Sequence, residues 1–319
     1  MKNIKFIDLC AGIGGFRIAF EKAGAQCVMT CEIDKFAKQT YLANFEENHF
    51  EPDIKKIDEK TMSDFDILCA GFPCQAFSLA GKQAGFADIR GTIFFDIVRI
   101  LKEKRPKGFL LENVKNLKSH DKGNTFKVIQ KNLDDLNYWH QDFIVNPQSL
   151  VPQRRERVYI LGANKDLYTK EQFDKLVEDV RADIAHTHQQ PGKRFETILN
   201  KDDMSQFTLS DKLWSFLQEH ARKHAAAGNG FGYGLMNPET DVTARTLTAR
   251  YHKDGSEILV AQKGQNPRRL SPRECARLMG FPEDFKIVAS KTQSYKQFGN
   301  SVVVPVISLF ANRLVNFIK

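Results

Sequence analysis

Long apolar stretches are missing from this chain of 319 residues, and no run approaches the roughly 20 residues that a membrane-spanning helix needs. The first residues, MKNIKFIDLCAGIGG, place Asp8 inside their apolar stretch and lack the uninterrupted core of a signal peptide. Internal repeats and low-complexity segments are also absent. We therefore expect a soluble cytoplasmic protein that does not associate with a membrane.

Cysteine spacings that would mark a disulfide or zinc framework are lacking too. Six cysteines are scattered through the chain: Cys10, Cys27, Cys31, Cys69, Cys74 and Cys275. Cys27 and Cys31 have no second Cys or His pair to complete a zinc site. We expect no metal and no disulfide framework, and most of these cysteines read as small buried apolar residues.

Size and charge set broad limits on the function. The length suits about two domains of roughly 150 residues each, and 42% hydrophobic with 27% charged residues excludes a disordered tail or a coiled coil. The net charge of +8 suits a polyanionic partner such as nucleic acid. Charge alone leaves an ordinary basic protein equally open.

Short apolar runs alternate with longer amphipathic stretches in the first half of the chain. Strands are predicted at 4–9, 27–32, 65–72, 108–114 and 157–163, with helices between them. This alternation predicts an α/β fold with a doubly wound, mostly parallel sheet. A smaller, loop-rich second domain is expected at 186–287, after a first domain at 1–185 that the C-terminal segment 288–319 completes.

Polar residues follow several of the predicted strands. Asp8, Glu32 and Glu112 end three of them, and Cys74 comes just past another. Ligands of open parallel sheets bind at the carboxyl ends of the strands, so these side chains predict a site at one edge.

The glycine-rich segment Gly12–Gly15 lies in the first strand-to-helix turn, where helix N–H groups and a close backbone approach can hold a cofactor. Its spacing is not GxGxxG, because Arg17 stands where the third glycine would be. Glu32 could accept hydrogen bonds from the ribose of either a nicotinamide cofactor or S-adenosylmethionine. A tight structural turn is the remaining alternative.

GFPCQAFS (71–78) presents a thiol in a loop, with Pro73 fixing the backbone before Cys74. Such a position favours a reactive thiolate. Glu112 is either a capped or salt-bridged acid or a carboxyl that stays protonated near neutral pH, and we favour the second. The arginines of QRRER (153–157) could bind anionic or carbonyl groups, or form a surface charge cluster.

Together these segments resemble the bacterial DNA cytosine-C5 methyltransferases. DLCAGIGGF, GFPCQAFS, ENV, QRRERV, RRLSPRECARLMGFP and QFGNSVVVPV are similar to motifs of that family in the same order, over almost the whole chain. The resemblance implies the S-adenosylmethionine-dependent methyltransferase fold. It also implies methyl transfer to C5 of a cytosine flipped out of duplex DNA.

The resemblance also implies residue roles. Cys74 would add to C6 of the base, Glu112 would hold N3, and Arg157 would lie against O2 with Arg155 on the phosphate. The matching cofactor positions are Asp8, Gly12, Gly14, Gly15, Glu32, Ile33, Asp53, Ile54, Pro73, Asn300, Ser301 and Val302. The DNA-binding candidates are Ser78, Arg245, Thr246, Arg250, Tyr251 and Lys253.

Two positions depart from the family pattern. Members often have a phenylalanine where this chain has Cys10 and a tryptophan where it has Ile33, and both positions pack around the adenine. We expect an altered cofactor affinity rather than a loss of binding.

GNGFGYG (228–234) and TLTARYHKDGSEIL (246–259) are similar to the recognition regions of Dcm-type and EcoRII-type enzymes and their CCNGG relatives. This implies a CCWGG- or CCNGG-like site in a restriction–modification system, with a separate companion endonuclease left open. A monomer would suffice for this chemistry. The alternatives are a tRNA cytosine-C5 methyltransferase, a non-catalytic DNA-binding regulator and a nicotinamide-dependent oxidoreductase.

Overall fold

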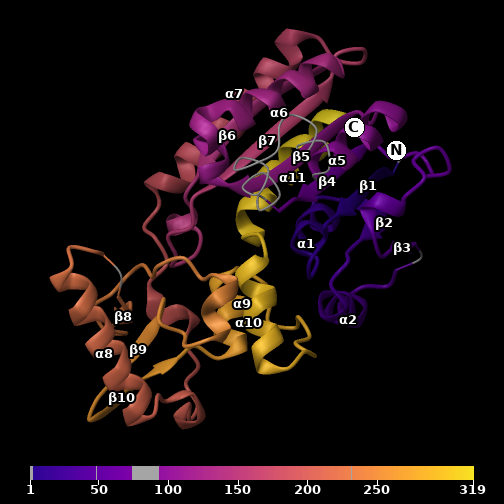
Figure 1. The fold of residues 1–319 in the computed structure, drawn as a ribbon. Helices are drawn as coiled ribbons and strands as arrows, with labels where there is room; N and C mark the ends of the chain where they lie inside the picture. Colours follow the sequence, from indigo (N-terminus) through magenta and orange to yellow (C-terminus); the bar gives the residue numbers. More distant parts are fainter. Residues whose placement is uncertain (1–2, 48, 74–92, 231) are drawn as a thin grey trace. The chain divides into compact units, whose positions relative to one another are not determined.

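The structure is a computed structural model that describes residues 3–47, 49–73, 93–230 and 232–319. The chain divides into two compact units (Figure 1). Unit 1 comprises 1–145, 156–186 and 304–319, and unit 2 comprises 146–155 and 187–303. The C-terminal segment 288–319 is therefore divided, since its first 16 residues fall in unit 2.

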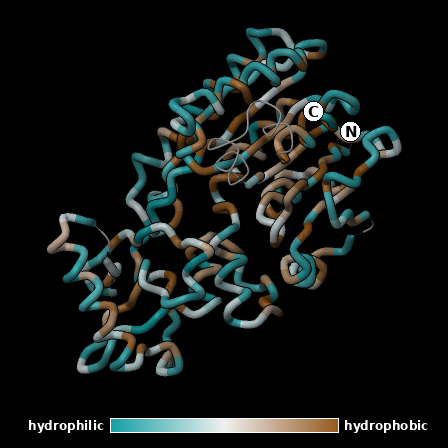
Figure 2. The backbone as a smooth tube through the Cα atoms, in the orientation of Figure 1, coloured by the Kyte–Doolittle hydropathy of each residue, from teal (hydrophilic) through white to brown (hydrophobic). Residues whose placement is uncertain are grey.

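A seven-stranded sheet forms the centre of unit 1. Its strands lie in the order β3 (Phe50–Glu51), β2 (Ala25–Cys31), β1 (Ile4–Leu9), β4 (Ile67–Gly71), β5 (Gly108–Val114), β7 (Arg157–Asn164) and β6 (Tyr138–Val145). The inner residues of β1, β4, β5 and β7 are almost fully buried, and Figure 2 shows the centre of the sheet largely in brown. The near-continuous apolar runs reflect helices on both faces of the sheet.

Helices cover the two faces of this sheet. Helices α5 (Ile93–Lys104) and α6 (Asn124–Asp135) pack in one apolar core with alternate residues of β1, β4 and β5. Helices α1 (Gly15–Lys22) and α11 (Val304–Ile318) pack on the other face, where Phe20 contacts Phe6 and Phe310 contacts Tyr159. The predicted doubly wound sheet is confirmed.

The far edge of the sheet differs from the prediction. β7 is antiparallel to β5 and to β6, and β6 was not predicted at all. The segment between β6 and β7 contains no α-helix, whereas a parallel crossover usually needs one. β6 escaped prediction because its centre, His140–Asp142, is polar.

Unit 1 also contains the helices α2, α7 and η1. Helix α2 (Lys35–Asn44) follows β2, with the Asp34 carboxylate accepting from two N–H groups of its first turn. Helix α7 (Lys170–Gln189) continues past β7 and was not predicted; Arg313 of α11 pairs with its Asp183 at 2.7 Å. The short helix η1 (Ile54–Lys56) follows β3.

Unit 2 holds a three-stranded sheet in the order β10 (Gln265–Arg269), β9 (Leu259–Gln262) and β8 (Leu235–Met236). It also holds the helices α8 (Asp211–Ala226), α9 (Pro272–Leu278) and α10 (Lys291–Asn300). The 16-residue α8 was not predicted, because only Leu217 of its residues is buried and its sequence shows little apolar periodicity.

The start of α9 follows its predicted pattern. Ser271 caps the helix, Pro272 occupies its first turn, and Glu274 completes the capping box. Glu274 is fully buried and both its oxygens accept from Arg268 at 2.9 Å. This bidentate pair joins β10 to α9 inside unit 2.

Among the described residues, no single helix is long and apolar enough to cross a membrane. Only α10 and α11, taken together as a bent pair, reach that length and composition.

Candidate active site

The strand register brings two of the predicted polar residues of unit 1, Glu32 and Glu112, to one edge of the sheet. Leu9 pairs with Cys31 on one side and with Ala70 on the other, so Glu32 follows directly at the end of β2. One residue further along β4, Gly71 pairs with Glu112. Because β1, β2, β4 and β5 are parallel, their carboxyl ends meet at this edge, as predicted.

Glu112 and Arg157 form an ion pair at this edge. The Nε of Arg157 lies 3.2 Å from Oε1 of Glu112, and their side chains are 14% and 11% exposed. Antiparallel pairing of β5 with β7 places Val114 opposite Arg157, two residues beyond Glu112. This ion pair corresponds to one of the two alternatives expected for Glu112, the salt-bridged acid.

Asn113 ties the end of β5 to the chain that follows β4. Its side-chain amide donates to the carbonyl of Phe72 at 2.8 Å, and Asn113 itself is only 3% exposed. Asn113 had no predicted role, although its position directly after Glu112 in the ENV motif was the available signal. The predicted residues Cys74 and Ser78 lie outside the described part of the chain.

The glycine turn before α1 is built by backbone conformations that suit glycine. Gly12 and Gly14 have φ angles of +57° and +88°. A Cβ on Gly12 would meet open space, whereas one on Gly14 would lie 2.3 Å from the ring of Phe45. The turn is therefore packed tightly on its inner side and open beside Gly12.

Glu32 connects this turn to the end of β2 by a hydrogen bond. Its two oxygens accept from the N–H groups of Gly12 and Asp34, both at 2.7 Å. Burial raises the pKa of Glu32, and these two backbone hydrogen bonds oppose the shift. Each oxygen keeps a lone pair that could accept from a ribose hydroxyl.

Arg17, two residues after the glycine turn, forms a hydrogen-bonded network that was not predicted. Its guanidinium donates to Glu21 at 2.7 Å, to Glu47 at 2.6 Å and to the carbonyl of Glu46 at 2.6 Å. The side chain is only 8% exposed, so the network is largely shielded from water. The sequence has an arginine two residues after the glycines, but it belongs to no motif that would have indicated this network.

Asp8 lies near Arg17 and is fully buried. Neither of its oxygens has a hydrogen-bond partner among the described residues. Burial raises the pKa of Asp8 well above its usual range, while the Arg17 guanidinium opposes the shift. A fully buried carboxyl has no surface to offer a cofactor in this structure.

This burial predicts a pH-dependent stability. In the unfolded chain Asp8 loses its proton near pH 4, but in the folded chain it keeps the proton to higher pH. Unfolding therefore releases a proton between the two pKa values, and rising pH favours unfolding. Asp8→Asn removes this penalty. We therefore expect the Tm of Asp8→Asn minus the Tm of the parent to be about 2–4 °C larger at pH 8 than at pH 5.

Thermal unfolding of Asp8→Asn and of the exposed matched variant Asp58→Asn, each at both pH values, measures this effect. An Asp58→Asn variant with the same pH trend would contradict the assignment to Asp8.

The other predicted cofactor residues of unit 1 differ in what they can offer. Ile33 is 73% exposed, so its side chain is available to cover a base. The Asp53 carboxylate accepts from the N–H of Lys55 and caps η1, and Ile54 is buried in the core. Ile54 can therefore act only through its backbone, whereas Pro73 is exposed.

These residues fit S-adenosylmethionine. An acceptor at the ribose position, an exposed apolar side chain beside it and open space over Gly12 match the hydroxyls, the adenine and the close backbone approach. In unit 2, Asn300 is exposed while Ser301 and Val302 are buried.

Two predicted contacts in unit 2 need correction. Tyr251 is fully buried, donating to the carbonyl of Ile258 and accepting from the N–H of Leu270, both at 2.7 Å. Arg155 is 3% exposed and donates to backbone carbonyls inside unit 2. Neither side chain is at the surface, so the predicted contacts with DNA do not fit this structure.

The other DNA-binding candidates of unit 2 stay accessible. Arg245, Arg250 and Lys253 are exposed, and the Arg245 guanidinium donates to the carbonyl of Gly232 at 3.0 Å. Thr246 is half-buried and its hydroxyl donates to the carbonyl of Arg154.

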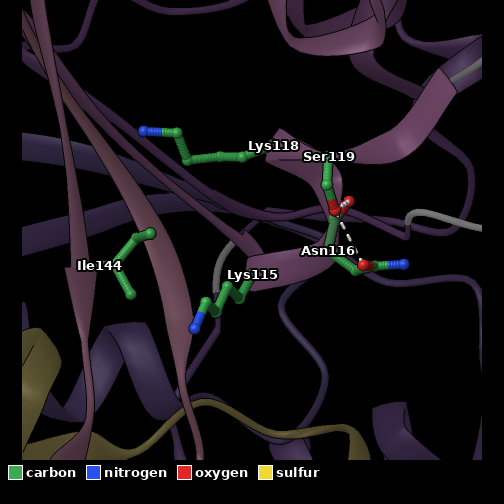
Figure 3. Close-up of a pocket in the computed structure, with 5 residues that line it drawn as sticks. All are labelled: Lys115, Asn116, Lys118, Ser119 and Ile144. Carbon is green, nitrogen blue, oxygen red and sulfur yellow. Dashed lines mark hydrogen bonds between the residues drawn. The ribbon is translucent and has the colours of Figure 1, made fainter. Parts of the chain in front are cut away.

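A hollow of about 350 Å³ opens just past Glu112 in unit 1 (Figure 3). Its walls are Lys115, Asn116, Lys118, Ser119 and Ile144. Lys115 pairs with Glu156 at 2.9 Å and Lys118 with Asp142 at 2.5 Å, which offsets their charges. We therefore regard the hollow as the outer edge of the candidate site and not as a separate anion site.

The fold and the edge geometry define the class as an S-adenosylmethionine-dependent methyltransferase. Residues 4–316 match the family C-5 cytosine-specific DNA methylase, and the chain belongs to that family.

Named relatives agree over nearly the whole chain. It is 50% identical to the type II methyltransferase M.SsoII of Shigella sonnei, covering 98% of this chain and 80% of the relative. It is 42% identical to a DNA-cytosine methyltransferase of Escherichia coli K12 (99% and 78%) and 40% identical to M.HhaI of Haemophilus parahaemolyticus (98% and 94%).

Among solved structures, the S. pombe Dnmt2 methyltransferase superposes with a TM-score of 0.78 at 20% identity, covering 99% of both chains, which shows the shared fold. The protein is thus a DNA cytosine-C5 methyltransferase that uses S-adenosylmethionine as its methyl donor.

Proposed function

We propose that this enzyme methylates C5 of a cytosine flipped out of a short duplex site, with Cys74 as the nucleophile. The Cys74 thiolate forms a bond to C6 while Glu112 supplies a proton at N3, which moves electron density onto C5. C5 takes the methyl group and then loses its proton to a base, and the bond from Cys74 to C6 breaks. Bound S-adenosylmethionine supplies the electrophilic methyl group.

The pairing of Glu112 with Arg157 carries this proposal. A flipped cytosine presents O2, N3 and the 4-amino group along one edge. A protonated Glu112 can donate to N3 and accept from the amino group, while the Arg157 guanidinium donates to O2. The 3.2 Å ion pair supports this arrangement because it holds both side chains at the strand ends before the base arrives.

For the cofactor, we propose that Gly12, Gly14, Gly15 and Glu32 hold the ribose side and Ile33 covers the adenine. Asp53 and the backbone of Ile54 would bind the adenine edge, and Pro73 would lie near the methionine end. Asn300, Ser301 and Val302 would contribute from unit 2. We propose no cofactor contact for Asp8, because its carboxyl is fully buried.

We propose a CCWGG- or CCNGG-like recognition site, read by the region 186–287. Its support is the similarity of 228–234 and 246–259 to Dcm-type and EcoRII-type recognition regions. Arg245, Arg250 and Lys253 are exposed candidates for base or phosphate contacts, with Thr246 beside the flipped base. Ser78 is a further candidate.

The names of the type II relatives support a role in restriction–modification, with a companion endonuclease as a separate protein. We propose a monomer acting in the bacterial cytoplasm.

The test is methyl transfer to unmethylated phage DNA and, separately, to tRNA, followed by nucleoside analysis and bisulfite sequencing of the DNA. We expect 5-methylcytosine in DNA at one short site. Methylated tRNA alone would instead support the tRNA enzyme, and DNA binding without transfer would support the regulator. A mapped site unlike CCNGG would overturn only the recognition proposal.

A further inference from the structure

Arg155 joins two distant parts of unit 2 through one buried guanidinium. Its Nη1 donates to the carbonyl of Leu247 at 2.6 Å, and its Nη2 donates to the carbonyls of Gly299 at 3.0 Å and Ser301 at 2.8 Å. The residue is 3% exposed, so these bonds form away from water. Leu247 and Gly299 are separated by more than 50 residues in the sequence.

The carbonyls of Gly299 and Ser301 lie at the carboxyl end of α10. The last carbonyls of a helix have no partner within the helix and carry partial negative charge. The Arg155 guanidinium supplies both the missing donors and a favourable positive charge. It therefore fixes the path of Asn300, the residue between its two acceptors.

The segment that contains Leu247 is also held by hydrogen bonds. Gln153 is fully buried, and its side-chain oxygen accepts from the N–H of Leu247 at 2.7 Å. The N–H of Arg154 donates to the carbonyl of Ala244 at 2.9 Å. The segment 153–155 thus runs along 244–247 and holds the chain around Thr246 in place.

The two sides also touch directly. A Cβ on Gly299 would lie 2.3 Å from the carbonyl carbon of Thr248 and 2.4 Å from the nitrogen of Ala249. With no space between them, a displacement of 246–249 must move the end of α10 as well.

We infer that Arg155 is a positioning residue that couples DNA binding at 245–253 to cofactor binding at 300–302. The inference rests on the proposed function, which places DNA at the first segment and S-adenosylmethionine at the second. Contact of DNA with the Thr246 segment stabilises the arrangement that Arg155 holds, and the same arrangement presents Asn300. Binding of either ligand then strengthens binding of the other by the same factor.

Lysine cannot replace this guanidinium. Arginine offers five N–H donors spread over a planar fork, and here they bond carbonyls of two separate segments. A lysine has its three donors on one nitrogen, so it keeps the charge but loses the bridge. Arg155→Lys therefore separates the bridge from simple electrostatics.

The experiment measures the Kd of S-adenosylhomocysteine by calorimetry with and without a 30-bp duplex carrying the mapped site. In the parent protein we expect the duplex to tighten binding at least about 10-fold. In Arg155→Lys we expect this factor to fall below about 2. Arg268→Lys is the matched control, because Arg268 is equally buried in unit 2 but pairs with Glu274 instead.

Loss of coupling in Arg155→Lys with coupling retained in Arg268→Lys supports the inference, even if both variants have a lower Tm. Equal coupling in Arg155→Lys and the parent would overturn it, as would a parent that binds both ligands without coupling. A parent that binds neither the duplex nor S-adenosylhomocysteine overturns the proposed function, and the inference with it.

Discussion

Glu112→Gln is expected to lower kcat for methyl transfer about 1,000-fold, within the range that general acid catalysis contributes. The amide keeps the size of the side chain but cannot supply a proton to N3, so attack at C6 is no longer assisted. It also loses the ion pair with Arg157. We expect the Kd of S-adenosylhomocysteine to change by less than about twofold, because Glu112 is not proposed to contact the cofactor.

Single-turnover kinetics with labelled S-adenosylmethionine measure this effect. Glu156→Gln is the matched control. Glu156 is exposed, lies directly before β7 and also pairs with a basic residue, Lys115. We expect it to keep the parental rate. A Glu112→Gln enzyme that transfers methyl groups within about tenfold of the parent would remove Glu112 from the chemistry.

Gly14→Ala is expected to lower kcat/KM for S-adenosylmethionine by on the order of 100-fold, the loss that a displacement of about 1 Å can cause. The new methyl group would lie 2.3 Å from the ring of Phe45 and 3.2 Å from Tyr41. Tyr41 is fully buried and bonded to Thr30 at 2.7 Å, so it cannot move aside easily. The glycine turn must shift instead.

Gly24→Ala separates this clash from backbone strain. Gly24 has the same φ of +88°, but a Cβ there meets nothing within 4 Å. Both variants should lose stability from the left-handed conformation, by roughly 1–2 kcal/mol. Only Gly14→Ala should lose cofactor efficiency, measured by steady-state kinetics and thermal unfolding. Equal kinetic losses in the two variants would show that the packing of Gly14 is irrelevant to the cofactor.

The sheet and most of its edge could be predicted from sequence, because local patterns determine them. Buried runs such as 4–9 and 108–114 mark strands between helices, and parallel strands must end together. The positions of Glu32 and Glu112 at one edge follow from that rule alone. The capping box of Ser271 and Glu274 is likewise a local signal.

What could not be predicted depends on tertiary contacts. Nothing in QRRER distinguishes Arg155, which is buried, from Arg154, which is exposed. Tyr251 is likewise buried by residues far along the chain, such as Leu270. The strand β6 lacks a distinctive period, the antiparallel direction of β7 depends on its pairing with β5 and β6, and the exposed helix α8 has one buried residue.

A duplex in which the target cytosine carries fluorine at C5 tests directly whether Cys74 is the nucleophile. After addition of the Cys74 sulfur and methylation, the fluorine cannot leave as a cation, so the bond from enzyme to DNA cannot break. We predict a stable adduct of the parent enzyme, mapped to Cys74 by mass spectrometry and absent in Cys74→Ser. An adduct that persists in Cys74→Ser, or one mapped to another residue, would contradict the assignment of the nucleophile.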